Sequence, residues 1–356
     1  MKKKTTLKDV AGMAGVSVSC ASMILNGSAQ SRFSAEKVEL VHGVAEKLNY
    51  CPPAERTIKK QIAVLSPAVN NPYYTMLISG IDLSAFSMGY TTCVFNVYWN
   101  PSTEVLLLNR LSQSNYCGII FIYTPMCPDI VHRLSQSFPI VAIGDILSNL
   151  EIDTVDVNNY KAGEMVAEHL LSLGHRHIAY LTTGVNEHHI SRVRRGKGLK
   201  DYYAACCPDG EVTIIEENNP FEDEIRLPGI EYATGEKLAY RCLEKPEITA
   251  IAAINDMVGY GIYDTLVREG FTIPGDYSIC GFDNAFPSGL KNISLTSIEN
   301  HTFSHGKSAV QLLIDRLERS TPGKDGEPIS HVEYLPKLII RGSTGRPGDR
   351  QGVIGT

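Results

Sequence analysis

Long apolar segments are what this sequence lacks most clearly. None of its hydrophobic runs reaches the roughly 20 residues that a membrane-spanning helix needs. The basic start, Met1 to Lys4, could imitate the beginning of an export signal, but Lys8 and Asp9 interrupt the apolar run that such a signal requires. We therefore expect no membrane association and a cytoplasmic location.

The cysteines lack any framework. They number nine, are scattered, and include the adjacent pair Cys206 and Cys207, which fits neither a redox motif nor the usual zinc spacing. Catalytic motifs are missing as well, because there is no G-x-S-x-G and Gly306-Lys307-Ser308 is only half of a phosphate loop. We expect free thiols in a reducing compartment, no catalytic residues, no metal and no cofactor, and thus no enzyme.

Charge is distributed unevenly along the 356 residues, a length that suggests two or more domains. Residues 1–60 hold ten Lys and Arg against five Asp and Glu, whereas the rest of the chain holds 23 against 34. A small basic head on an acidic body indicates that only the head meets a polyanion such as DNA. On charge alone, a chance cluster on a solvated surface is the alternative.

The head reads as three short helices. Thr6 and Asp9 form a capping box for the first, Gly15 ends it, and Ser17 caps a second helix that runs to about residue 26. Ser34 is expected to cap a third. Two helices joined by a tight glycine turn are typical of a helix-turn-helix, whose second helix enters the major groove of DNA.

Several head motifs fall in register with one known family. The head resembles the DNA-binding headpiece of the lactose-repressor (LacI/GalR) family at Leu7-Lys8-Asp9-Val10-Ala11, Ala14-Gly15-Val16-Ser17, Ser22 and Leu25-Asn26. A generic three-helix domain that binds protein is the alternative. The resemblance implies DNA contacts by Thr6, Leu7, Ser17, Val18, Ser19, Cys20, Ser22, Met23 and Asn26.

The head also departs from that family. Cys20-Ala21-Ser22-Met23 stands where the family usually has Thr-Val-Ser-Arg, so the base-reading positions lack an arginine able to hold guanine with two hydrogen bonds. We predict an unusual operator with weaker hydrogen-bond readout. The linker, residues 51–61, carries Pro53 where the family has Asn. Arg56 and Ile58 could replace the usual arginine and the leucine that wedges into the minor groove, and a rigid connector without a wedge is equally open.

Residues 62–345 alternate short β-rich runs with helical patterns, which predicts α/β structure with parallel sheets. Ligands on such sheets bind beyond the carboxyl ends of the strands. Carboxylates, amides, a tyrosine and an arginine that could converge there would suit a polyol, because each sugar hydroxyl both donates and accepts hydrogen bonds. The candidates are Asn71, Tyr73, Asp145, Asn255 and Asp283, each after an expected strand, together with Arg195.

The resemblance to the lactose-repressor family extends over this body. It is carried by Asn71-Pro72-Tyr73-Tyr74, Asp156-Val157-Asn158-Asn159, the run from His169 to Ala179, Arg195-x-x-Gly198, Ala253-Ile254-Asn255-Asp256, Gly281-Phe282-Asp283-Asn284 and Leu338-Ile339-Ile340-Arg341. It implies two periplasmic-binding-protein-like lobes, each a doubly wound parallel sheet, joined by three crossings. It also implies an effector cleft lined by Asp145, Arg195, Asn255 and Asp283, and structural roles for His169, His175 and His177.

Some alternatives stay open in the body. Taken singly, Asn255 or any other polar residue after a strand is as readily a turn former or helix cap. Residues 216–231 look inserted relative to the family, and Phe221 and Tyr232 are candidates for an aromatic that stacks on ligand. Residues 346–356 are glycine-rich and are expected to form a disordered tail.

Together these features predict a transcriptional regulator with a DNA-binding domain at residues 1–50 and an effector-binding and dimerisation domain at residues 62–345. We expect a repressor that acts as a homodimer on double-stranded, pseudo-palindromic operator DNA and responds to a small molecule, preferably a carbohydrate. The alternatives are a regulator whose corepressor is a phosphoprotein and a sugar-binding protein that does not bind DNA.

Overall fold

The computed structural model describes residues 6–25, 33–48, 50, 60–145, 150–184, 190–218, 229–318 and 328–348. The chain forms two compact units, a headpiece, Met1–Lys60, and a body, Gln61–Thr356. The boundary falls at the end of the expected linker.

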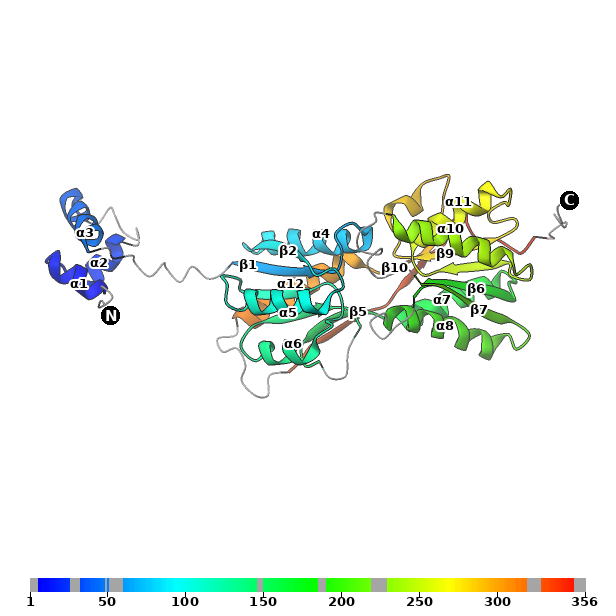
Figure 1. Cartoon of the computed structure of the whole chain (residues 1–356), viewed down its shortest axis with the longest axis horizontal. Coiled ribbons are helices and arrows are strands. Elements are labelled where there is room, and N and C mark those ends of the chain that lie inside the picture. The colour runs from blue at the N-terminus through cyan, green and yellow to red at the C-terminus, as the bar shows by residue number, and fades with distance from the viewer. Residues whose placement is uncertain are drawn as a thin grey trace. The chain divides into compact units, whose positions relative to one another are not determined.

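Three helices form the headpiece, α1 (Leu7–Met13), α2 (Val18–Leu25) and α3 (Ala35–Lys47), drawn in blue in Figure 1. The capping box at Thr6 and Asp9 is present at the start of α1. Gly15 has a positive φ of 65°, and the turn that it makes sets α1 and α2 at 105° to each other. This angle is that of a helix-turn-helix.

A small apolar core holds the three helices together. Val10, Ala21, Ile24 and Val41 are fully buried in it, with at least one residue from each helix. The Ser17 hydroxyl accepts a hydrogen bond from the Cys20 backbone N–H at 3.2 Å, as expected for the start of α2. Ser34 stands at the start of α3 but, within the described residues, its side chain makes no capping hydrogen bond. Ser34 therefore stands at the predicted start of the helix, but the predicted side-chain cap is wrong.

Among the described residues, no single helix has the length and apolar character needed to cross a membrane. The bent pair of α1 and α2 meets the criterion only when its two helices are counted as one, and then by length and composition alone.

The body contains two six-stranded sheets, each with helices on both faces (Figure 1). Lobe 1 has strand order β11-β5-β4-β3-β1-β2, and all its strands are parallel. Its elements are β1 (Gln61–Ser66), α4 (Pro72–Ser87), β2 (Thr91–Asn96), α5 (Pro101–Leu111), β3 (Gly118–Phe121), α6 (Pro128–Ser135), β4 (Ile140–Ile143), β5 (Asp153–Val157), α12 (Thr302–Glu318) and β11 (His331–Tyr334).

Lobe 2 has the order β12-β10-β9-β8-β6-β7, in which only β12 is antiparallel to its neighbour. Its elements are α7 (Asn159–Ser172), β6 (His177–Thr183), α8 (Ile190–Cys206), β7 (Glu211–Glu217), α10 (Ile230–Leu243), β8 (Ala250–Ala253), α11 (Asp256–Arg268), β9 (Ser278–Phe282), the short 3-10 helix η2 (Phe286–Gly289), β10 (Thr296–Glu299) and β12 (Lys337–Ile339).

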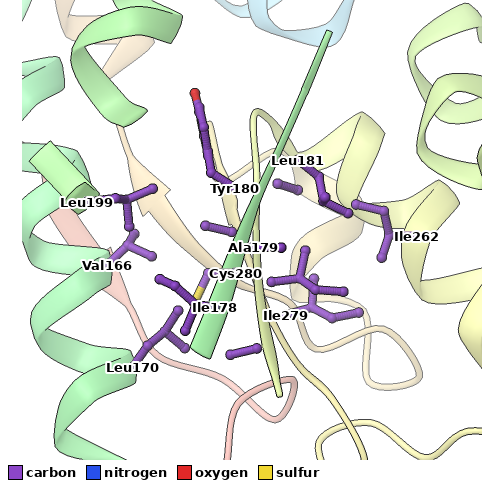
Figure 2. Close-up of a cluster of buried hydrophobic side chains, with 14 of the residues drawn as sticks. Val166, Leu170, Ile178, Ala179, Tyr180, Leu181, Leu199, Ile262, Ile279 and Cys280 are labelled. Carbon is purple, nitrogen blue, oxygen red and sulfur yellow. The ribbon is translucent and has the colours of Figure 1, made fainter. Parts of the chain in front are cut away.

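Central strands are apolar along their whole length because helices cover both faces of each sheet. In β1, Ile62 and Val64 pack with α4 and α12, whereas Ala63 and Leu65 pack with α5 and α6. Figure 2 shows the corresponding packing in lobe 2, where Leu170 of α7 lies on one side of β6 and Ile262 of α11 on the other. The doubly wound architecture predicted from the sequence is confirmed.

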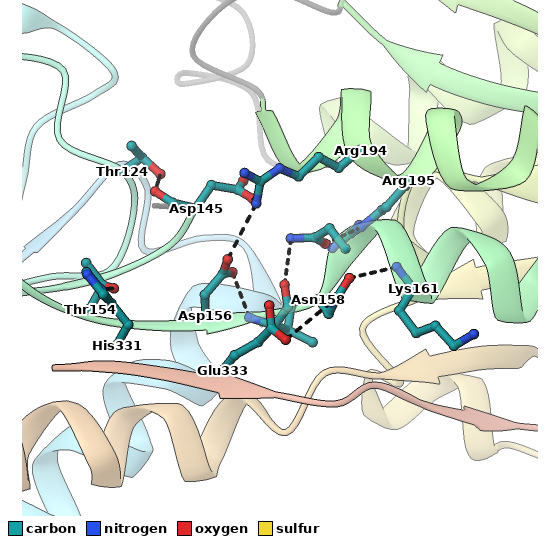
Figure 3. A network of polar contacts seen from close by, with 12 residues as sticks. Thr124, Asp145, Thr154, Asp156, Asn158, Lys161, Arg194, Arg195, His331 and Glu333 are labelled. Atoms are coloured by element: carbon teal, nitrogen blue, oxygen red, sulfur yellow. Dashed lines mark hydrogen bonds and ion pairs between the residues drawn. The ribbon is translucent and has the colours of Figure 1, made fainter. Parts of the chain in front are cut away.

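Three segments connect the lobes, namely β5 to α7, β10 to α12 and β11 to β12. Two of them are tied together, because Asn158, between β5 and α7, donates its backbone N–H to the Tyr334 carbonyl at 3.1 Å and its side-chain amide to Glu333 at 3.2 Å. The same side chain caps α7 by accepting from the Lys161 N–H at 2.8 Å (Figure 3).

Helices α7 and α8 touch at the backbone. A Cβ atom at Gly163 would overlap the carbonyl oxygen of Arg195, and one at Gly198 would overlap that of Tyr160. Reciprocal glycines join α4 to α12 and α10 to α11 in the same way. Close packing through Gly163 and Gly198 fixes the position of the α8 turn that carries Arg195.

Several elements differ from expectation. Sequence patterning predicts a helix only from Lys200 to Cys206, but α8 begins at Ile190, so Arg195 lies within a helix. Strands β11 and β12 were not predicted. His175 is fully buried and bonds to Thr249 and Ser278, and no group of three metal-binding side chains occurs among the described residues. Residues 346–348 of the expected tail are placed, and the rest of the tail lies outside the described residues.

Candidate ligand cavity and DNA-reading surface

A cavity of about 130 Å³ lies in the body between the carboxyl ends of the two sheets. Lobe 1 contributes residues that follow β1, β2, β3 and β4, and lobe 2 contributes residues that follow β8 and β9 together with the starts of α7, α8 and α10. The structure brings all six predicted ligand-binding residues to this cavity: Asn71, Tyr73, Asp145, Arg195, Asn255 and Asp283.

Arg195 is held rigidly in lobe 2. Its side chain is 8% exposed, and it donates to the Asn159 side-chain oxygen at 2.9 Å and to the Ile254 carbonyl at 2.7 Å. Its guanidinium also lies 4.6 Å from the centre of the Phe282 ring. These contacts orient the charge at the cavity wall before any ligand arrives.

Asp283 is the acidic counterpart of Arg195. Burial raises the pKa of its carboxyl well above the usual range, and the nearby Arg195 opposes that rise. Its backbone has a positive φ of 111°, and one carboxyl oxygen accepts from the Asn300 amide at 3.0 Å. A non-glycine residue held in this conformation stores local strain, which is common where a side chain must be aimed at a ligand.

Two polar bridges cross the cavity between the lobes. Arg194 of α8 donates to Asp145 of lobe 1 at 2.9 Å, as Figure 3 shows. Glu231, at the start of α10, accepts from Asn71 of lobe 1 and from Asn255 of lobe 2, each at 2.9 Å. Asn71 and Asn255 also cap α4 and α11. Each residue therefore has the helix-capping role that the sequence left open and also lies at the cavity.

Lobe 1 holds a pair of acids beside the first bridge. Burial, and then the charge of Asp145, raises the pKa of Asp156 to about 7. Burial also raises the pKa of Asp145, although Arg194 and Arg195 lower it. Arg194 lies 3.8 Å from Asp156 as well, so one cation serves two carboxyls.

Aromatic rings form much of the lobe 1 wall. Tyr73, Tyr74, Trp99 and Tyr123 line the cavity, and Trp99 meets Tyr123 edge to face with ring centroids 5.4 Å apart. Trp99 follows β2 and has a positive φ of 48°. Rings of this kind bind the apolar faces of small polar ligands.

Sequence reasoning missed several lining residues, among them Trp99, Glu231 and His305. Trp99 follows β2, but the rule that selected candidates looked for polar residues after strands and passed over a tryptophan. Tyr232, considered as a stacking aromatic, instead bonds to Asp264 at 2.6 Å, and Phe221 lies outside the described residues.

The headpiece presents the start of α2 to solvent. Ser17, Val18 and Ser19 are exposed, and Ser22 and Met23 are half-buried. Cys20 was expected to contact DNA, but its side chain is only 8% exposed and packs in the three-helix core. That prediction is corrected, because a side chain turned into the core does not reach a base edge.

The other predicted DNA contacts vary in position. Thr6 is exposed at the start of α1, whereas Leu7 is half-buried against the core. Asn26, Arg56 and Ile58 lie outside the described residues, so their contacts stay predictions.

Comparison with known families and proteins gives consistent matches. A model described as "Bacterial regulatory proteins, lacI family" matches residues 6–53, and one described as "Periplasmic binding protein-like domain" matches residues 167–344, half of the chain. The HTH-type transcriptional repressor PurR of Haemophilus influenzae (strain PittEE) is 26% identical over 347 residues, which are 95% of this chain and 98% of that protein. The HTH-type transcriptional regulator DegA of Bacillus subtilis (strain 168) is 28% identical over 356 residues, 96% of this chain and 98% of its own.

Among solved structures, a LacI family transcriptional regulator from Enterococcus faecium with bound ribose has a TM-score of 0.67 at 22% identity, over 81% of this chain and 99% of that one. This likeness shows the fold. The two family matches and the two relatives, together with the helix-turn-helix geometry, confirm the regulator predicted from the sequence. The chain belongs to the LacI family of bacterial regulatory proteins and is a DNA-binding transcriptional regulator, not an enzyme.

Proposed function

We propose that this regulator is a cytoplasmic repressor whose affinity for operator DNA is controlled by a small sugar bound in the cavity between the lobes. The observation that carries this proposal is the convergence of Asp145, Asn255 and Asp283, each after a strand, and of Arg195 from α8 on one cavity. A ligand that contacts residues from both lobes stabilises one arrangement of the lobes over others, which is how binding couples to a distant DNA site.

The chemistry of the wall favours a polyol. Carboxylates accept, the arginine donates, and the amides do both, so a ring of hydroxyl groups finds complementary partners. Aromatic rings such as Trp99 offer flat apolar surface for the C–H face of a sugar. The cavity of about 130 Å³ is small, which favours a monosaccharide over a larger ligand. The related Enterococcus faecium regulator was solved with ribose.

An exposed apolar surface supports assembly as a homodimer. Met76 and Phe286, which is 84% exposed, line one hollow beside α4, and Leu83 and Phe86 extend the apolar surface along that helix. Such a patch on a protein surface marks an interaction site, and a second copy of the chain meets it symmetrically. Phe286→Glu should then lower the mass measured by light scattering from dimer to monomer. Leu335→Glu, at another exposed leucine, is the control that should stay dimeric.

We assign the reading of DNA to the exposed residues Val18 and Ser19 at the start of α2 and to half-buried Met23 further along the helix. Val18 and Met23 suit contact with a thymine methyl, and Ser19 can make a single hydrogen bond. Selection of duplexes from a random library by the full chain, at stated salt, should recover a two-fold-symmetric motif rich in A·T pairs at these positions. Weak, salt-sensitive binding without a motif would contradict sequence-specific readout.

The ligand proposal is tested by thermal melting of the full chain with D-ribose, D-xylose, D-glucose, D-galactose and the disaccharide cellobiose. We expect one monosaccharide to raise the Tm and cellobiose to have no effect, because the cavity is small. Asp283→Asn should abolish the shift, whereas Asp129→Asn, at an exposed acid on α6 outside the cavity, should keep it. If no sugar moves the wild-type Tm or operator affinity, the proposal fails.

A further inference from the structure

His305 is the least satisfied polar side chain at the cavity. It lies in the first turn of α12, its side chain is 1% exposed, and it lines the cavity from lobe 1. Neither of its ring nitrogens has a hydrogen-bond partner among the residues that the structure describes. A buried polar side chain without a hydrogen-bond partner lowers the stability of the fold. Because His305 lies at a cavity, a ligand group that enters the cavity can become its partner.

The surroundings of His305 do not supply that partner. Ile122, Ile143 and Val155 form the apolar floor of the cavity on this side. The ring of Tyr334 packs against the imidazole with centroids 4.7 Å apart, while the Tyr334 hydroxyl bonds to Ser308 at 2.8 Å instead. The imidazole is therefore held by packing, and the cavity is the open direction for its polar atoms.

The protonation state of His305 defines what it can recognise. Burial, and then the neighbouring His301, lowers its pKa to about 4, so the ring is neutral at physiological pH. A neutral imidazole has one N–H donor and one nitrogen acceptor. A hydroxyl group, which also donates and accepts, satisfies either nitrogen, whereas an ammonium or guanidinium group only donates and can satisfy the acceptor nitrogen alone.

We propose that His305 binds the effector, and that it reads one hydroxyl group of a sugar whose other hydroxyls meet the lobe 2 residues. This inference rests on the proposed function and adds to it a residue of lobe 1 that determines specificity. It assigns the effector an orientation, with one hydroxyl directed toward His305 in lobe 1 and the remaining polar groups toward Arg195 and Asp283, which line the same cavity.

The first test needs no ligand. His305→Leu replaces an unpartnered polar ring by an apolar side chain of similar size on an apolar floor, so the ligand-free full chain should melt about 2–4 °C higher than the wild type. A histidine with a purely structural role would give a lower Tm when replaced. His301→Asn is the matched control, because it lies one turn earlier, outside this cavity, and asparagine tolerates the positive φ of 53° found there.

The second test couples the protein to the ligand. Calorimetric titration uses the monosaccharide that gives the largest thermal shift, and its deoxy analogues, each lacking one hydroxyl. In the wild type, one particular deoxy analogue should bind about tenfold more weakly than the parent sugar. In His305→Leu the parent sugar should be weakened about equally, and removal of that one hydroxyl should cost nothing more. His305→Gln keeps a hydrogen-bond donor and an acceptor, so it should retain part of the sugar affinity. This variant keeps the test decisive if His305→Leu does not fold.

The outcomes separate the two proposals. If the sugar binds His305→Leu as tightly as the wild type with the same deoxy profile, the role of His305 is overturned and the proposed function stands. If no sugar binds the wild type, the proposed function fails and this inference fails with it. Weaker binding by His305→Leu at an unchanged or higher Tm, with His301→Asn like the wild type, supports the assignment.

Discussion

The two lobes line the same cavity with different kinds of residue. Lobe 2 presents polar groups that already bond to one another, as Arg195 does to Asn159 and Ile254, and Asn255 to Glu231. Lobe 1 presents aromatic rings, an acid pair with raised pKa values and a histidine without a partner among the described residues. Two sheets of similar topology therefore give one wall whose polar groups bond to each other and, under the proposed function, another whose polar groups a ligand completes.

This difference suggests a division of labour. A preorganised wall loses little entropy when it binds, so lobe 2 supplies affinity. A wall whose polar groups lack hydrogen-bond partners discriminates between ligands, because a ligand without the matching hydroxyl leaves one of these groups unpaired. Both walls share one device, a loop after a strand with positive φ at non-glycine residues, Trp99 in lobe 1 and Asp283 in lobe 2.

The largest effect is expected from disrupting the scaffold of lobe 2. Gly198→Val places a branched side chain against the Tyr160 carbonyl, so α7 and α8 must separate. We expect unfolding free energy to fall by about 3 kcal/mol in urea titration, and sugar binding to weaken because Arg195 moves with α8. Gly289→Ala is the control, since nothing lies within 4 Å of the added methyl. An unchanged midpoint for Gly198→Val would contradict the close packing.

The next effect tests preorganisation directly. Arg195→Met removes the donor to Asn159 and Ile254 and the charge that opposes the rise in the Asp283 pKa. Sugar affinity should fall at least a hundredfold, and stability by about 2 kcal/mol, because two buried acceptors lose their partner. Titration calorimetry and urea unfolding measure the two. A variant that binds sugar normally would show that lobe 2 is not the principal source of affinity.

A smaller effect is expected in lobe 1. Trp99→Asn removes a ring from the wall but keeps a residue that tolerates positive φ, so binding should weaken about tenfold with little change in Tm. Tyr98→Asn, at the preceding residue with φ of 56° and outside the cavity, should bind sugar as the wild type does. Equal losses in both variants would mean that the loop conformation matters and the indole ring does not.

The smallest effect concerns pH. Asp156 has a pKa of about 7 in the folded chain, above the ordinary value of 3.8, so the folded state holds a proton that the unfolded state releases between these values. Its contribution to stability therefore decreases as pH rises from about 4 to 7. Asp156→Asn, which resembles the protonated acid, should gain a few degrees of Tm over the wild type between pH 5 and pH 8. A Tm difference that is constant with pH would contradict the raised pKa.

The sequence was sufficient for the central architecture. Apolar runs such as residues 62–65 predicted strands correctly because both faces of these strands are covered by helices. Five of the six predicted cavity residues meet because they follow strands whose carboxyl ends face the same cavity, whereas Arg195 reaches it from helix α8. Strands β11 and β12 escaped prediction because they are short edge strands in which no residue is fully buried, unlike the central strands.

Other features depend on tertiary contacts that no local pattern encodes. The start of α8 was missed because its first two turns are rich in arginine and show no apolar pattern. The role of these arginines becomes clear only in the folded chain, where Arg194 bonds to Asp145 of the other lobe. His305 sits on an ordinary amphipathic helix, and only the cavity distinguishes it from a core residue. Cys20 was assigned to DNA by its place in a motif, although helical phase turns it into the core.

The central claim is that a sugar in this cavity controls operator affinity, and one measurement tests it most directly. The full chain is titrated onto its selected operator duplex at fixed salt, with and without the saturating monosaccharide, for the wild type and for Arg195→Met. We predict a change of at least fivefold in operator Kd for the wild type and no change for Arg195→Met, whose sugar-free Kd stays normal. A sugar effect that persists in Arg195→Met, or is absent from the wild type with every sugar, would contradict the account.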